Sequence, residues 1–194
     1  MVTIDFETKP IDGNTSVNPP EPVGVAIKIP GKNAKYYAWG HPTKNNSTYD
    51  KARAALAAVW DKDLLFHNGK FDISVAIRWM GLPMPEATRI HDTMFLLFLD
   101  NPYSENLSLK PNAERLLDMP PEEQDRLADW ILAHTPCPSR AQTGAWIWAA
   151  PGDLVGKYAI GDVKRTHLLY QMLYDRIVER GMKVINKSPT KAIR

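Results

Sequence analysis

The segment TIDFET at residues 3–8 determines how the first part of this 194-residue chain folds. Together with Val2, it alternates apolar with polar residues at the period of a β-strand. Residues two apart on a strand share a face, so Asp5 and Glu7 would project side by side, away from the apolar side chains. Two carboxylates so close repel each other unless a cation lies between them. The segment therefore predicts a strand with a candidate cation site.

The next part of the chain predicts a mixed sheet. Strands are expected at residues 23–29, 35–39, 64–67 and 87–91, and helices at residues 49–60 and 71–81. The first three strands have short links, which is typical of an antiparallel meander. The fourth strand begins a strand, helix, strand crossover, which implies parallel pairing. Gly81 is well placed to end the second helix.

The second half of the chain predicts helices. They are expected at residues 92–99, 108–117, 122–134 and 151–181. The segment DTMFLLFL at 92–99 is apolar nearly all round, which predicts a buried helix, with Asp92 and Thr93 as its cap. The last helix would end at Gly181, and residues 182–194 would be a tail or linker. The whole pattern predicts a single α/β domain over residues 1–181.

Composition excludes several classes of protein. The chain is 44% hydrophobic and carries 24 Lys and Arg against 22 Asp and Glu, so it is neither disordered nor strongly basic. A single cysteine, Cys137, rules out an intramolecular disulfide and a cysteine-rich zinc site. The N-terminus lacks the pattern of a signal peptide, and no apolar run reaches roughly 18 residues. We expect a cytoplasmic protein with no membrane segment.

Two further acidic positions lie where they could join Asp5 and Glu7. Asp72 follows the end of a parallel strand, the edge at which open α/β sheets place their ligands. Tyr158 and Asp162 are four residues apart on the last helix and would share a face. Purely structural alternatives remain open, because Asp72 could cap its helix and Asp162 could pair with Lys164 or Arg165.

The four carboxylates form an all-oxygen set made up of Asp5, Glu7, Asp72 and Asp162. Hard oxygen ligands with open positions suit Mg²⁺ or Mn²⁺ rather than zinc. The chemistry that such a set best supports is phosphodiester cleavage assisted by two metal ions.

The sequence resembles a known nuclease family at three places in order: TIDFET, LLFHNGKFD at 64–72 and KYAIGDVKRT at 157–166. These segments resemble the three motifs of the DEDD, or DnaQ-like, 3′–5′ exonucleases. The tyrosine four residues before the last aspartate is typical of the DEDDy branch, and the chain is similar to the proofreading domains of family A DNA polymerases. The resemblance implies an RNase H-like fold, a five-stranded mixed sheet flanked by helices.

The resemblance also implies a role for each matching residue. Asp5, Glu7 and Asp162 would hold the metal ion of the attacking water, and Asp72 with Asp5 would serve the second ion. Tyr158 would orient the water. Two further positions, Thr8 and Asn68, would lie against the terminal nucleotide.

The activity implied is a 3′–5′ exonuclease that acts on single-stranded DNA ends and releases nucleoside 5′-monophosphates, as in proofreading. A DNA polymerase would be the partner, in cis or in trans, in a bacterial or phage-infected cell. Two alternatives stay open: an exoribonuclease resembling ribonuclease D, and a non-catalytic nucleic-acid-binding accessory domain of a polymerase. Nothing in the sequence reads the 2′-hydroxyl that separates RNA from DNA.

Two other features have competing interpretations. Trp146 and Trp148 lie in an irregular basic segment, where they could stack on single-stranded bases or close the core. Asp92 could be a fifth acid of the site, but the capping interpretation is stronger.

Overall fold

A five-stranded mixed sheet lies at the centre of the computed structural model, which describes residues 1–15 and 17–187. The strand order is β3-β2-β1-β4-β5. The strands are β1 (Val2–Thr8), β2 (Pro22–Lys28), β3 (Lys35–Ala38), β4 (Leu64–Phe66) and β5 (Ile90–Asp92). The pairs β1–β2 and β2–β3 are antiparallel, whereas β4 runs parallel to both β1 and β5. The predicted five-stranded mixed sheet is confirmed.

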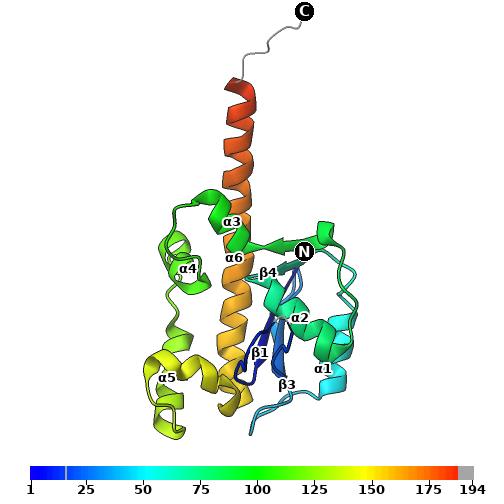
Figure 1. Ribbon diagram of the computed structural model, residues 1–194, viewed down its shortest axis with the longest axis vertical. Helices are drawn as coiled ribbons and strands as arrows, with labels where there is room; N and C mark the ends of the chain where they lie inside the picture. Colours follow the sequence, from blue (N-terminus) through cyan, green and yellow to red (C-terminus); the bar gives the residue numbers. More distant parts are fainter. Residues whose placement is uncertain (16, 188–194) are drawn as a thin grey trace, which may run out of the picture.

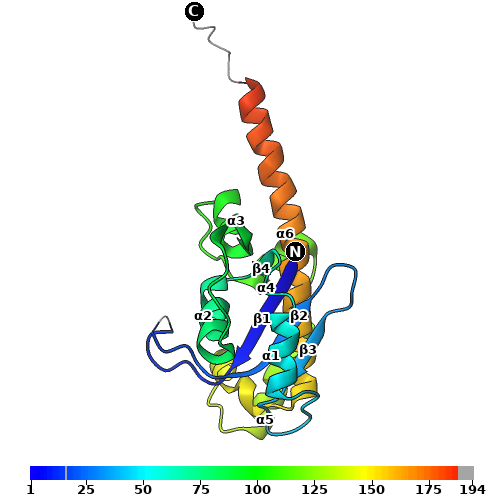
Figure 2. The same cartoon turned by 90° about the vertical axis from the view of Figure 1, so that its right-hand side faces the viewer.

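Helices cover both faces of this sheet (Figures 1 and 2). They are α1 (Tyr49–Ala57), α2 (Gly69–Met80), α3 (Thr93–Asp100), α4 (Leu109–Leu117), α5 (Glu122–His134) and α6 (Gly152–Lys187), with 3₁₀ turns η1 (Ala87–Arg89) and η2 (Arg140–Ala149). The apolar face of β1, with Ile4 and Phe6, packs in one core cluster with α1 and α2. The other face of the sheet packs against α5 and α6 in a second cluster. The polar face of β1 is thereby turned toward α6.

The helix α6 is longer than predicted. The sequence placed its end at Gly181, but the helix continues through Lys187. A glycine inside a helix costs only about 1 kcal/mol relative to alanine, and no proline follows within residues 182–187. The C-terminal end of α6 projects beyond the body of the molecule (Figure 1). The rest of the predicted tail, residues 188–194, lies outside the described residues.

The prediction that α3 is buried is wrong. Asp92 does cap it, with its side chain accepting from the Met94 amide, but Phe95 is 66% exposed and Phe98 is also exposed. The buried residues of α3 are Thr93 and Leu97, and Leu97 packs against α6. A helix of eight residues at the edge of the sheet has one neighbour to pack on, so its other faces stay in water.

The helices give no sign of a membrane span. Among residues 1–15 and 17–187, none of them combines the length and the apolarity that a lipid bilayer requires.

Candidate active site

The two acids of β1 lie on its polar face, where the strand is paired with β2. Asp5 is opposite Ala26, and Glu7 is opposite Gly24. The register shifts between Glu7 and Thr8, which ends regular pairing immediately beyond the second acid. Glu7 is buried and Asp5 is partly exposed. The strand therefore presents both carboxylates at one edge of the sheet, as its period predicts.

Asp72 ties α2 to β1. It is 3% exposed, and its Oδ1 accepts a hydrogen bond of 2.8 Å from the backbone N–H of Phe6. This amide lies beyond the part of β1 that pairs with β4, so the aspartate supplies the partner that the neighbouring strand does not. The N-cap position of α2 belongs to Asn68. Asp72 thus points toward the β1 acids, and the alternative that it caps α2 is wrong.

Asn68 has a backbone conformation that few non-glycine residues adopt, with φ 65° and ψ 49°. Its side chain makes no capping hydrogen bond and is exposed. The Asp92 carboxylate holds this turn, because it accepts from the amides of Asn68 at 3.0 Å, Gly69 at 2.7 Å and Met94 at 2.8 Å. The capping interpretation of Asp92 is confirmed, and its role here extends to two helices. Backbone strain at a site is typical of ligand-binding turns.

Tyr158 and Asp162 reach the same place from α6. They are one turn apart, as their spacing predicts, and Asp162 is 5% exposed. The Asp162 Oδ2 atom lies 2.5 Å from Lys110 Nζ, whereas its buried Oδ1 atom has no hydrogen-bond partner among the described residues. A buried oxygen without a partner is costly, so this atom is suited to a further cation.

The five residues form one electrostatic group. Desolvation of the Asp5 carboxyl by the surrounding protein, followed by the negative charge of Asp162, raises its pKa from 3.8 to about 7. Burial, followed by the charge of Asp5, raises the pKa of both Glu7 and Asp72 well above the ordinary value. Burial also raises the pKa of Asp162, although the positive charge of Lys110 lowers it in part. Burial, followed by the negative charge of Asp162, raises the pKa of Tyr158. The structure therefore brings together all five residues that the sequence placed at the site.

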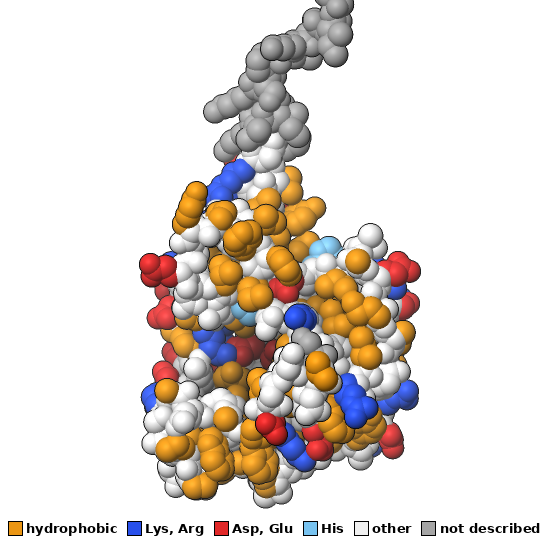
Figure 3. All heavy atoms as spheres, viewed as in Figure 1, with side chains coloured by type: hydrophobic (Ala, Val, Ile, Leu, Met, Phe, Trp, Pro, Cys, Tyr) orange, Lys and Arg blue, Asp and Glu red, His pale blue; other side chains and the backbone are white. Residues whose placement is uncertain are grey.

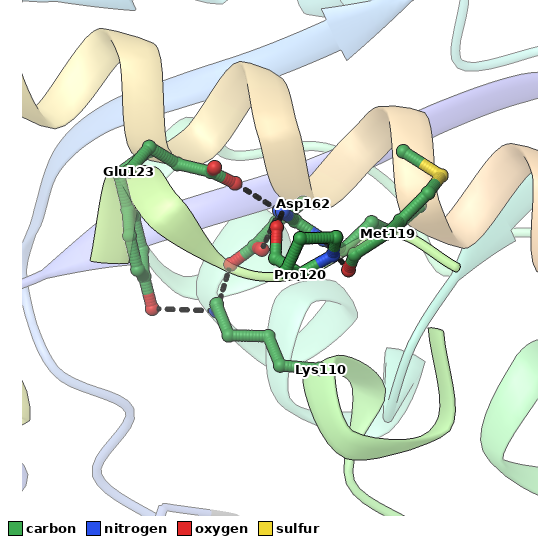
Figure 4. Close-up of polar contacts among 7 residues, drawn as sticks. Lys110, Met119, Pro120, Glu123 and Asp162 are labelled. Carbon is green, nitrogen blue, oxygen red and sulfur yellow. Dashed lines mark hydrogen bonds and ion pairs between the residues drawn. The ribbon is translucent and has the colours of Figure 1, made fainter. Parts of the chain in front are cut away.

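Two basic residues border the acids and were not predicted as site residues (Figure 4). Lys110, in the first turn of α4, contacts both Asp162 and the Tyr158 hydroxyl. Arg165 pairs with Glu123 and lies 3.6 Å from Asp162 Oδ1, which bears out part of the alternative that Asp162 pairs with a basic neighbour. Only the position of Arg165, three residues after Asp162, could have signalled it in the sequence. Figure 3 shows acidic side chains within a hollow of this face, with basic ones beside them.

The donor set fits a hard divalent cation in its chemistry, but the side chains are not arranged as a finished ligand set. All four acids offer oxygen, they are crowded, and Asp162 Oδ1 accepts no hydrogen bond within the described residues. Among residues 1–15 and 17–187, however, no three His, Cys, Asp or Glu side chains lie close enough together to hold a metal ion as they stand. Two of the acids, Asp72 and Asp162, are engaged by Phe6 and Lys110. Binding a metal ion therefore requires side chains to move.

A cavity of about 330 Å³ opens beside the acids of β1. Its lining residues are Phe6, Glu7, Thr8, Lys9, Pro10, Ile11, Phe71, Gly144 and Ala145. Thr8 thus lies in the cavity next to Glu7, as its position predicts. Trp146 packs partly buried against the core cluster of α5 and α6, which favours the interpretation that it closes the core.

Gly24 is needed behind Glu7. A Cβ atom at this position would collide with the Tyr36 hydroxyl, which is hydrogen-bonded to Nε2 of the buried His41 at 2.7 Å. The negative charges of Glu7 and Asp5 contribute, after burial, to a raised pKa of Tyr36. The absence of a side chain at Gly24 therefore lets a tyrosine hydroxyl approach the back of the acidic cluster.

Solved structures of nucleases are similar to this one. NrnC of Brucella melitensis matches 93% of this chain and 74% of its own with a TM-score of 0.59 and 22% identity. The chain shares its fold with NrnC. Another structure of NrnC, with a TM-score of 0.57, contains bound Mg²⁺. A third, with a TM-score of 0.56, is bound to pGG. Both are 22% identical to this chain and match 93% of this chain and 74% of their own. The apo form of a nuclease, 19% identical over 93% of this chain and 74% of that one, also gives a TM-score of 0.59. No protein-family model and no curated protein matches the sequence.

Proposed function

We propose that the protein is a metal-dependent 3′–5′ exonuclease that hydrolyses phosphodiester bonds at single-stranded DNA ends and releases nucleoside 5′-monophosphates. The observation that carries the proposal is the gathering of four mutually repelling carboxylates and Tyr158 from three elements onto one site. Such crowding is stable only with added positive charge. The fold shared with NrnC, of which one structure contains Mg²⁺, supports the same conclusion.

Each acid has a proposed place in the reaction. Asp5, Glu7 and Asp162 would hold one ion, and Asp72 together with Asp5 would hold the second. Bound at these carboxylates, Mg²⁺ or Mn²⁺ supplies the acidity that ionises water at neutral pH and the positive charge that offsets the leaving 3′ oxygen. Asp5, shared between the two, is the residue on which the arrangement depends most.

Tyr158 and the cavity beside Glu7 would position the reactants. Burial raises the pKa of Tyr158, so its hydroxyl keeps its proton at neutral pH and can orient the attacking water but not deprotonate it. The cavity is at the small end of the range for ligand pockets, which suits a single terminal nucleotide. Thr8 would contact that nucleotide from the cavity wall, and the exposed side chain of Asn68 would contact it from the α2 turn.

A second substrate class has one observation in its favour. NrnC in one of the similar structures is bound to pGG, an oligonucleotide. A short RNA oligonucleotide is therefore the alternative to a DNA end, and it agrees with the exoribonuclease that the sequence left open. Proofreading for a DNA polymerase in cis or in trans is proposed only with the DNA substrate.

Cleavage of matched single-stranded DNA and RNA oligonucleotides, labelled at the 5′ end, tests the proposal. With Mg²⁺ we expect a ladder of DNA products that shorten from the 3′ end, and nucleoside 5′-monophosphates in solution. A chelator should stop the reaction, and a blocked 3′ hydroxyl should delay it. A ladder with RNA alone would favour the oligoribonuclease. No cleavage of either polymer with Mg²⁺ or Mn²⁺ would support the non-catalytic accessory domain instead.

Replacement of Tyr158 by phenylalanine should slow the chemical step by about fivefold. The change removes one hydrogen bond, a contribution of about 1 kcal/mol to the transition state, and keeps the ring in place. Single-turnover kinetics should show the loss, whereas calorimetric titration with Mn²⁺ should give a dissociation constant within about twofold of the wild type. An equal loss in metal affinity would show that the hydroxyl serves the metal site and not the water.

A further inference from the structure

Lys110 occupies the oxygen atoms on which the proposed chemistry depends. Its Nζ atom lies 2.5 Å from Asp162 Oδ2 and 3.0 Å from the Tyr158 hydroxyl, and 4.2 Å above the centre of the Tyr158 ring. The lysine side chain is 15% exposed. Figure 4 shows it reaching from α4 across to α6. An ammonium group so placed offsets part of the negative charge of the cluster.

The two basic residues of the site differ in how firmly they are held. Arg165 is 3% exposed and bonds to Glu123 and to the carbonyl oxygens of Met119 and Pro120. Its guanidinium is thereby fixed in place on several sides. The Lys110 ammonium group hydrogen-bonds only to Tyr158 and Asp162 within the described residues. A lysine on its flexible stem can leave two contacts more easily than this arginine can leave its set.

Lys110 and a metal ion would compete for Asp162. Two cations at a single carboxylate group repel each other strongly. The acids of the described residues do not yet converge as a ligand set, so some contact must break when an ion binds. The Lys110–Asp162 ion pair is the contact that a cation at Asp162 replaces directly, because the incoming ion brings the same sign of charge.

The neighbourhood offers Lys110 a second position. A cavity of about 310 Å³ borders α4 on the side of Lys110. Glu114, one turn further along α4, lines the same cavity and is exposed. Within the described residues Glu114 belongs to no ion pair. Lysine and glutamate four residues apart on a helix can pair without any movement of the backbone.

We propose that Lys110 is a positioning residue that controls metal loading: it holds Asp162 until a divalent ion takes this carboxylate, and then pairs with Glu114. The inference rests on the proposed metal-dependent function. It makes Lys110 neither a metal ligand nor a group that touches the reacting atoms. Its effect passes through Asp162, whose carboxylate it keeps neutralised and in place.

Calorimetric titration of the full chain with Mn²⁺ tests this in four proteins: wild type, Lys110→Met, Glu114→Gln and the double variant. We expect Lys110→Met to bind Mn²⁺ about tenfold more tightly, because one competing ion pair is removed. Glu114→Gln should bind it roughly two- to threefold more weakly, because the displaced lysine loses its partner. In the double variant the Glu114→Gln change should no longer weaken Mn²⁺ binding, since no lysine remains at position 110 to pair with Glu114.

Matched controls separate contact from general charge. Lys164→Met removes the same charge from an exposed position near Asp162 in the sequence, and Glu105→Gln removes an exposed acid near α4. Both should leave the Mn²⁺ affinity within about twofold of the wild type. A Lys110→Met protein that binds Mn²⁺ no more tightly than the wild type would overturn the proposal. So would a Glu114 effect that persists without the lysine.

The design also distinguishes the two proposals from each other. Wild-type protein that binds Mn²⁺ and cleaves DNA, with Lys110→Met showing no gain in affinity, would overturn only the role of Lys110. Wild-type protein that binds no Mn²⁺ would overturn the proposed function as well. If Lys110→Met fails to fold, Glu114→Gln on its own still decides, because the change is at an exposed position and predicts a specific loss of affinity.

Discussion

The Asp5→Asn protein is expected to lose nuclease activity by on the order of 10³-fold or more and yet to melt at a higher temperature than the wild type in chelator-containing buffer. Asp5 is the acid proposed to serve both metal ions. Loss of several kcal/mol of charge stabilisation in the transition state corresponds to about three powers of ten in rate. The amide is isosteric with the carboxylate, so the fold should be retained.

The gain in stability has a physical reason in the same cluster. The charge of Asp162 contributes to the raised pKa of Asp5, and the charge of Asp5 raises the pKa of Glu7 and Asp72. These shifts mean that the ionised acids destabilise the folded protein. Asparagine removes the negative charge that repels the carboxylates of Glu7 and Asp72. The melting temperature should therefore rise by several degrees.

Thermal melts with a chelator and single-turnover cleavage with Mg²⁺ measure the two effects. Asp118→Asn is the matched control, because Asp118 is exposed and lies in the left-handed conformation that asparagine tolerates. It should change neither quantity appreciably. An Asp5→Asn protein that is less stable than the wild type, or that still cleaves at a rate close to it, would contradict the role given to Asp5.

Without divalent ions, the wild-type protein should become less stable as the pH rises from about 6.5 to about 9. In the folded protein Asp5, whose pKa is raised to about 7, releases its proton within this range, whereas Glu7 and Asp72, whose pKa values are well above their ordinary values, keep theirs to higher pH. The unfolded chain has already released these protons. Because the folded state binds more protons, the free energy of unfolding falls as the pH rises.

Buried histidines act in the opposite direction but at lower pH. Burial lowers the pKa of His67 to about 4 in the folded protein. Below the ordinary pKa of 6.5, the imidazole binds a proton more readily in the unfolded chain, and this favours unfolding. Above that pH its contribution is complete and constant. The fall in stability between pH 6.5 and 9 therefore reports mainly the acids of the site.

Melting curves at several pH values, with a chelator or with Mg²⁺, measure this effect. We expect a decrease of roughly 5 to 10 °C across the range with the chelator. A much smaller decrease is expected with Mg²⁺, since the bound ions stabilise the ionised carboxylates. Asp5→Asn should show a shallower slope. A melting temperature that rises with pH over this range in the chelator would show that the carboxylates are not crowded.

Part of the site could be predicted because it depends on local periodicity. The alternation in residues 2–8 places Asp5 and Glu7 on one face of a strand, and the spacing of Tyr158 and Asp162 places them one turn apart on a helix. The first four strands and their mixed pairing follow from the same kind of pattern and from the crossover. The fifth was expected at residues 87–91, but residues 87–89 form the 3₁₀ turn η1 and the strand is Ile90–Asp92. A strand or a helix determines by itself which of its side chains share a face.

Other features could not be predicted because they depend on a neighbour distant in sequence. The burial of α3 depends on what packs around it, and α6 is the neighbour that covers its Leu97. The extension of α6 past Gly181 depends on whether any following residue ends the helix, and residues 182–187 do not. Hydrophobicity and a single glycine are weak signals when tertiary packing decides the outcome.

The sequence by itself determined the first four strands and the positions of the acids along β1, α2 and α6, because residues a few positions apart set the backbone period. Only the tertiary structure decided that Asp72 binds the amide of Phe6, and that Lys110 of α4 reaches Asp162 of α6. The physical reason is chain closure: these partners are 66 and 52 residues apart, and only packing of the elements on the sheet brings them within hydrogen-bond distance.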